Sequence, residues 1–163
     1  MSEPPVLHDF GCLDEEELRR LASRWAERWG AALRARGHRL LGLDGPLGAG
    51  KTTFVQSFVR ALPGGPDQEV SSPTYALVHV YGTKPIVRHL DLYRVSGPRE
   101  VEELDAVELF EAPGLVLIEW FERCKDAAPA NRVELSLEIA AGDRRNVKAV
   151  AHGQGRDWME ELK

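Results

Sequence analysis

One stretch of the sequence decides the fold: Gly45-Pro46-Leu47-Gly48-Ala49-Gly50-Lys51-Thr52. It fills every fixed place of the phosphate-binding loop (P-loop) pattern, in which two glycines enclose four residues and are followed by Lys and by Ser or Thr. The glycines allow backbone conformations in which successive N–H groups point at one anion. A helix that begins at Lys51 adds unpaired N–H groups and the positive end of its dipole. The stretch therefore predicts a binding site for nucleotide phosphates.

The residues of this loop have separate expected contacts. Those expected to bind the nucleotide are consecutive: Gly48, Ala49, Gly50, Lys51, Thr52 and Thr53. We expect the Lys51 ammonium to reach the β- and γ-phosphates and the Thr52 hydroxyl to coordinate Mg²⁺. Thr53 is expected at the α-phosphate. The predicted cofactors are therefore ATP or ADP with Mg²⁺.

The segments beside the loop agree with this prediction. Residues 40–44 are typical of a short apolar strand, and residues 51–62 have the apolar spacing of a helix that Pro63-Gly64-Gly65-Pro66 ends. Upstream, Asp14 and Glu17 form a capping-box pattern, and the apolar residues that follow predict an amphipathic helix of about four turns. A strand, a glycine-rich loop and a helix thus follow one another in the expected order.

The rest of the chain is richer in strand patterns. Residues 76–81 and 86–92 predict an antiparallel pair, because only a short turn joins them. Residues 115–118 are apolar throughout, which indicates a strand covered on both faces. Residues 133–139 and 147–151 predict a closing hairpin, and a short helix is expected between 101 and 109. The sum is an α/β fold with parallel and antiparallel strands in one sheet.

A P-loop site also needs an acid at the end of a neighbouring strand, which binds Mg²⁺ or orients the attacking water. The sequence offers two candidates for it. Glu119 follows the buried apolar run, and Asp91 ends the strand before it. We favour Glu119 on the metal, directly or through water, and Asp91 near the γ-phosphate or the attacking water; which acid is nearer the metal stays open. The candidate catalytic residues are thus Asp91, Lys51 and Glu119.

Three further features lie near these acids in the sequence. Ser72-Pro73-Thr74-Tyr75 is a rigid, hydroxyl-rich turn that could present Thr74 to the metal or the γ-phosphate, as switch loops do. His89 is better explained as a structural residue than as a catalytic one. Trp120, beside Glu119, is either a core residue or a gate to the nucleotide site.

Composition limits the classes of protein. The 163 residues fit one domain, with residues 1–10 and 153–163 as candidates for flexible ends. The net charge of −5 argues against a protein that binds nucleic acid by itself. No apolar run approaches the length of a membrane span and the N-terminus lacks signal-peptide features. With two distant cysteines and no metal-binding spacing, the expected location is the cytoplasm.

Four blocks of the sequence resemble the TsaE (YjeE) family, bacterial ATPases of tRNA threonylcarbamoyladenosine biosynthesis. They are residues 45–53, Ser72-Pro73-Thr74-Tyr75-Ala76-Leu77-Val78, His89-Leu90-Asp91-Leu92-Tyr93-Arg94 and Glu119-Trp120, in matching order and spacing. The resemblance extends from the N-terminal helix to the last hairpin. The second and third blocks make it specific, since a P-loop alone occurs in many families.

This resemblance implies a single P-loop ATPase domain over 1–163, with the three-layer fold of P-loop NTPases and central parallel strands flanked by antiparallel ones. It implies binding of ATP or ADP with Mg²⁺, slow hydrolysis, and action with the TsaD and TsaB proteins, through which alone tRNA would be reached. The family's metal ligands correspond to Thr52 and Glu119, its important acid to Asp91, and its tryptophan to Trp120. Departures from the family pattern leave phosphate chemistry intact but weaken any inference about adenine contacts; they are Leu18, Pro46, Ala76 and Phe121.

Other functions remain as alternatives. A small-molecule kinase would need an acceptor pocket and an arginine-bearing lid, and the C-terminal third instead predicts a hairpin. A GTPase is disfavoured because the sequence has no N-K-x-D segment. A nucleotide-sensing module without essential hydrolysis is the alternative that is not an enzyme.

Overall fold

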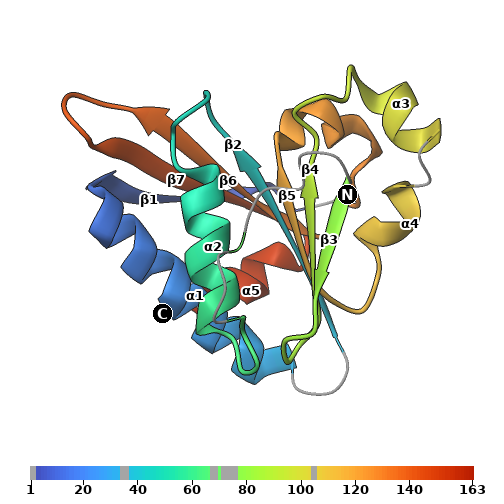
Figure 1. The fold of residues 1–163 in the computed structure, drawn as a ribbon, viewed down its shortest axis with the longest axis horizontal. Helices are drawn as coiled ribbons and strands as arrows, with labels where there is room; N and C mark the ends of the chain where they lie inside the picture. Colours follow the sequence, from blue (N-terminus) through green and yellow to red (C-terminus); the bar gives the residue numbers. More distant parts are fainter. Residues whose placement is uncertain (1–2, 34–36, 67–69, 71–76, 104–105) are drawn as a thin grey trace.

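A computed structural model describes residues 3–33, 37–66, 70, 77–103 and 106–163. In these residues one sheet of seven strands, in the order β1-β7-β6-β2-β5-β4-β3, organises the molecule (Figure 1). The strands are β1 (Val6–Leu13), β2 (His38–Asp44), β3 (Val78–Tyr81), β4 (Val87–Asp91), β5 (Gly114–Glu119), β6 (Arg132–Ile139) and β7 (Arg145–His152). The central strands β6, β2, β5 and β4 are parallel, whereas β1, β7 and β3 are antiparallel to their neighbours. The predicted fold class is confirmed.

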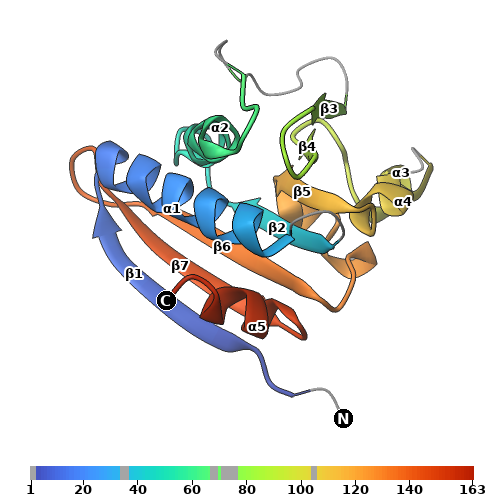
Figure 2. The same cartoon turned by 90° about the horizontal axis from the view of Figure 1, so that it is seen from below.

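Helices lie on both faces of the sheet, as Figure 2 shows. They are α1 (Glu15–Leu33), α2 (Lys51–Ala61), α3 (Pro98–Glu103), α4 (Ala106–Phe110) and α5 (Gly155–Glu160), with short 3₁₀ turns η1 (Phe121–Arg123) and η2 (Lys125–Ala127). One core joins α1, α2 and α5 to one face, and a second core joins α3 and η1 to the other face of β2, β5 and β4. The result is a three-layer arrangement.

Strand β5 shows how the sequence produces these layers. All six of its residues are buried. Leu115 and Leu117 belong to the core under α1 and α2, while Val116 and Ile118 belong to the core on the opposite face. Successive side chains of a strand alternate between faces, so only a continuous apolar run satisfies both cores.

Helix α1 begins at the predicted cap. The backbone N–H of Glu17 donates to Oδ1 of Asp14, and that of Asp14 donates to Oε2 of Glu17, each over 2.8 Å. Two backbone N–H groups are thereby satisfied at the start of the helix. At its far end, Trp29 is buried and its Nε1–H donates to the carbonyl oxygen of Trp158 over 2.9 Å. The helix is anchored at both ends.

Regular structure occupies the end segments that were candidates for flexibility. Strand β1 pairs along its length with β7, with an irregularity between Asp9 and Gly11. Helix α5 buries Trp158 and Met159 against the core. The region expected to hold one short helix contains two, α3 and α4. No helix in the described residues is long and apolar enough to cross a bilayer.

Candidate functional site

A cleft of about 370 Å³ lies at the carboxyl ends of β4 and β5 and beside the loop between β2 and α2. It is lined by Glu15, Leu47, Gly48, Gly50, Lys51, Thr52, Thr53, Asp91, Tyr93, Glu119, Trp120 and Arg145. The cleft thus collects the predicted site residues with one exception, Ala49, whose side chain is buried. Open α/β sheets bind ligands at this edge of the sheet.

Two glycines of the loop occupy positions that a side chain would not tolerate. Gly45 has φ +152°, and a Cβ on it would lie 2.4 Å from the carbonyl oxygen of Leu137 in β6. Gly50 has φ +108°, and a Cβ there would lie 2.9 Å from Cδ2 of Leu18 in α1. The loop therefore packs tightly between α1 and β6, in a conformation that requires glycine.

The ammonium of Lys51 lies folded back on its own loop. It donates to the carbonyl oxygen of Pro46 over 3.1 Å and to that of Gly45, and it lies 3.9 Å from the centroid of the Trp120 ring. Burial lowers its pKa, while the carboxylates of Glu119, Glu122, Asp44 and Asp91 act in the opposite direction. Lys51 is thus a buried cation, held by carbonyl oxygens and an aromatic face.

Thr52 and Glu119 meet across the cleft. The Thr52 hydroxyl donates to Oε2 of Glu119 over 2.8 Å. On its other side the Glu119 carboxylate is 2.8 Å from Nε2 of His89, and both of these side chains are buried. Sequence reasoning did not predict the His89 contact, although alternate residues of β4 place His89 and Asp91 on one face. His89 therefore fixes the position of Glu119.

Asp91 is the immediate cross-strand neighbour of Glu119, because β4 and β5 pair in that register. Its Oδ1 accepts the backbone N–H of Tyr93 over 3.0 Å. Burial raises the pKa of Asp91, and the charge of Glu119 raises it further. The two candidate acids thus line the cleft side by side, at the carboxyl ends of neighbouring strands.

Trp120 has a backbone conformation that is rare for a residue with a side chain, with φ 57° and ψ 45°. Its ring lies 5.1 Å from that of Tyr93, whose side chain is half exposed. Strained residues of this kind cluster at functional sites, where the surrounding structure holds them in place. The Trp120 ring covers Lys51 and also packs against the second core, so it has features of both a core residue and a gate. The predicted switch, Ser72-Pro73-Thr74-Tyr75, lies outside the described residues.

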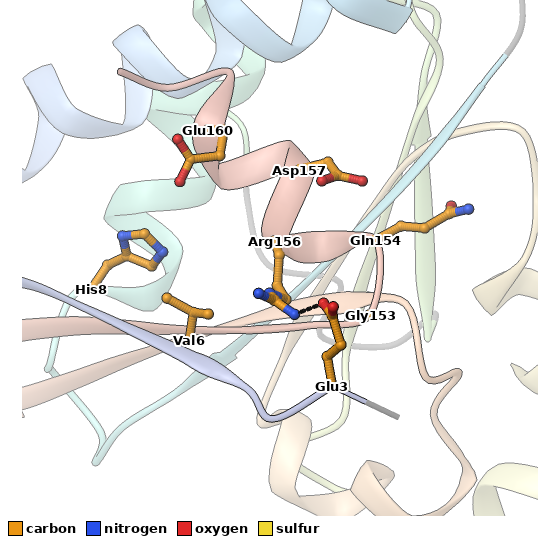
Figure 3. Close-up of a pocket in the computed structure, with 8 residues that line it drawn as sticks. All are labelled: Glu3, Val6, His8, Gly153, Gln154, Arg156, Asp157 and Glu160. Carbon is orange, nitrogen blue, oxygen red and sulfur yellow. Dashed lines mark hydrogen bonds and ion pairs between the residues drawn. The ribbon is translucent and has the colours of Figure 1, made fainter. Parts of the chain in front are cut away.

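A second hollow of the same volume, about 370 Å³, lies between β1 and α5 (Figure 3). Three carboxylates line it, those of Glu3, Asp157 and Glu160, and its Arg156 is paired with Glu3. Volume does not distinguish the two hollows, but chemistry does. An acidic lining disfavours phosphate, whereas the first cleft has a lysine and a helix start.

Fold and cleft together define an α/β protein that carries a P-loop sequence between a central parallel strand and the next helix. The family model of the threonylcarbamoyl adenosine biosynthesis protein TsaE matches residues 12–147. The chain therefore belongs to the TsaE family, which functions in the biosynthesis of threonylcarbamoyladenosine on tRNA.

Individual relatives agree with this assignment. The TsaE protein of Bacillus subtilis (strain 168) is 35% identical over 126 residues, which are 76% of this chain and 77% of that protein. The TsaE protein of Treponema pallidum (strain Nichols) is 34% identical over 105 residues, or 64% of this chain and 76% of that one. The crystal structure of YdiB from Bacillus subtilis matches with a TM-score of 0.73 at 26% identity, covering 99% of this chain and 97% of that chain.

Proposed function

We propose that the cleft binds ATP or ADP with Mg²⁺ and that the protein hydrolyses ATP slowly. The observation that carries this proposal is the meeting of Lys51, the start of α2 and the Thr52–Glu119 pair in one cleft. An ammonium and unpaired backbone N–H groups suit phosphates. A hydroxyl and carboxylates are hard oxygen ligands of the kind that Mg²⁺ prefers.

Lys51 and Asp91 would act directly on the nucleotide. Lys51 would exchange the carbonyl oxygens of Gly45 and Pro46 for phosphate oxygens, which are stronger acceptors because they are charged. Asp91 would orient the attacking water or face the γ-phosphate from the adjacent strand.

Thr52 and Glu119 are the residues that would hold Mg²⁺. The described residues contain no group of three or more His, Cys, Asp or Glu side chains arranged for a metal, so the ion would also need phosphate oxygens and water as ligands. Mg²⁺ bound there would neutralise charge on the phosphates. The Thr52–Glu119 hydrogen bond keeps these two oxygen ligands together in the free protein.

The same proposal extends to the pathway. The protein acts with TsaD and TsaB in the cytoplasm, and the ATP-bound form, with the γ-phosphate beside the Glu119-Trp120 edge, docks on these partners. Hydrolysis then removes the γ-phosphate contacts and resets the complex. With a net charge of −5 the chain does not bind tRNA by itself and reaches it through its partners.

Calorimetric titration with ATP and ADP in magnesium, followed by turnover with and without the TsaB–TsaD pair, tests this function. Uptake of nucleotide and faster turnover with the partners are expected. Absence of uptake by folded protein would refute it. Phosphate transfer to a metabolite would instead identify a kinase, and a hydrolysis-dead variant that supports tRNA modification would identify a sensing module.

The matching variant is Lys51→Ala. It removes the ammonium that we assign to the phosphates, so nucleotide affinity should fall by at least tenfold, the effect of one charge-assisted hydrogen bond of roughly 1.5–3 kcal/mol. The far-ultraviolet circular dichroism should not change.

A further inference from the structure

Arg145 is a cleft residue to which the proposed function gives no role. It is the first residue of β7 and pairs with Leu13 of β1 and Ile139 of β6. Its Nε–H donates to the carbonyl oxygen of Ala49 over 3.1 Å, and its Nη1 donates to that of Asp143 over 3.0 Å. A residue far along the chain thus bonds to the backbone of the P-loop.

The preceding residue, Arg144, makes its contacts away from the P-loop. Arg144 bonds to Glu17 in α1 over 3.1 Å and to the carbonyl oxygen of Cys12 in β1. Arg144 is absent from the lining of the cleft, whereas Arg145 is part of it. Of these two neighbouring arginines, Arg145 is therefore the one whose replacement would remove a hydrogen bond to the P-loop.

Planarity of the peptide bond gives this contact a consequence. In a trans peptide the C=O of one residue and the N–H of the next point in opposite directions. When Arg145 holds the oxygen of Ala49, it therefore turns the N–H of Gly50 away from β7. Gly50 lines the cleft and precedes the first residue of α2, so its N–H is one of the helix-start donors that have no partner within the helix.

This peptide needs an external restraint. Its orientation is set by ψ of Ala49 and by φ of Gly50, which is +108°. Glycines place few limits on the orientation of the peptides that they flank. A reversed Ala49–Gly50 peptide would present a carbonyl oxygen to the phosphates in place of an N–H donor, and would thus oppose the anion.

We propose that Arg145 is a positioning residue that fixes the Ala49–Gly50 peptide with the Gly50 N–H available to phosphate. The inference rests on the proposed function, because it assumes that phosphates bind in the loop. Arg145 acts through the backbone of the loop and is assigned no contact with the base or the ribose.

Arg145→Ala tests this role with two probes, Mg²⁺-ADP and Mg²⁺-tripolyphosphate, which has no nucleoside. We expect both dissociation constants to rise by the same factor, about tenfold to a hundredfold, the effect of one hydrogen bond to a charged group. The Gly50 amide resonance of the ligand-free protein should shift. Arg145→Lys, which keeps a donor and the charge, should restore part of the affinity and move the resonance back. The matched control is Arg88→Ala, since Arg88 also bonds to a backbone carbonyl, that of Pro113, but lies outside the cleft lining.

Each other outcome has a definite meaning. Loss of ADP affinity alone would show a contact with the nucleoside and overturn the positioning role. Equal losses of affinity for both probes, with no shift of the Gly50 amide resonance, would show that Arg145 acts only through its charge. A lysine variant that regains affinity while the Gly50 resonance stays shifted would show the same. Either result would overturn the positioning role. Unchanged affinities would overturn it directly. If the wild-type protein bound neither probe, the proposed function itself would fail. Should Arg145→Ala not fold, Arg145→Lys alone decides, because an unshifted Gly50 resonance with altered affinity would contradict the proposal.

Discussion

Nε2 of His89 and Oε1 of Glu119 lie 2.8 Å apart in the interior, although the two residues belong to different strands, β4 and β5. The His89 side chain has no exposed surface, and Glu119 has 3%. The other ring nitrogen, Nδ1, has no hydrogen-bond partner in the described part of the chain. The contact with Glu119 is therefore the polar interaction that holds the ring in place.

Replacement of His89 by Ala should destabilise the protein and disturb the metal site. Loss of a buried hydrogen bond to a carboxylate costs about 1.5–3 kcal/mol, which urea unfolding would measure. The Mg²⁺ concentration needed for nucleotide binding should also rise, since Glu119 loses its support. His79→Ala is the control, because His79 is only partly buried and its ring contacts Tyr81. Equal stability of the two variants would contradict this prediction.

Gly45→Ala should disrupt the loop by direct collision. The new Cβ would lie 2.4 Å from a backbone oxygen of β6, and φ at this position is +152°. The backbone strain should lower the stability by about 1–3 kcal/mol, which thermal unfolding would measure. The displaced loop should weaken nucleotide binding, which a titration would measure. Gly97→Ala has open space around it and no unusual φ, so it should behave like the wild type. A Gly45→Ala protein with normal nucleotide binding would show that the loop tolerates a side chain there.

Asp91→Ala should impair turnover more than binding. A positioned acid or base contributes roughly 10²–10⁴ in rate, whereas the phosphate contacts of the loop are left intact. Steady-state turnover and a separate calorimetric titration would distinguish the two effects. A folded variant with normal turnover would refute the role that we assign to Asp91.

Asp44 should make stability depend on pH. Burial raises its pKa from 3.8 to about 7, with a side-chain hydrogen bond to Glu122 as the next cause. Because the folded protein binds this proton more tightly than the unfolded chain, the stability from this group is full below pH 3.8 and is lost as the pH rises towards 7. Asp44→Asn should flatten the unfolding free energy over this range. An unaltered pH profile in the variant would contradict the assignment.

The elements that the sequence predicted are those whose signal is local. The cap of α1, the glycines before α2 and the apolar run of β5 each carry their cause within a few residues. Strand β1 was missed because polar residues interrupt its pattern, and its partner β7 begins more than a hundred residues later. Helix α5 was missed because it is short and depends on Trp158 packing against Trp29.

The site residues also separate into those with a local sequence signal and those that depend on the tertiary structure. Lys51, Thr52, Asp91 and Glu119 could be selected from motif and strand-end position, and the structure brings them to one cleft. The support of Glu119 by His89 could have been inferred from the alternation along β4, which places His89 and Asp91 on one face. Arg145 could not, because only the pairing of β7 with β6 carries it to the loop.

The carboxylates around Lys51 bear on how the site would fill. Asp91, Glu119 and Glu122 all act on this single ammonium, so carboxylate groups outnumber it there. A bare triphosphate entering the cleft would meet repulsion, and a divalent ion arriving alone would lack the phosphate oxygens among its ligands. Each would increase the affinity for the other by the same factor, as thermodynamic linkage requires. On our proposal the two therefore enter as a single unit, and the free magnesium concentration in the cell sets how tightly the nucleotide is retained.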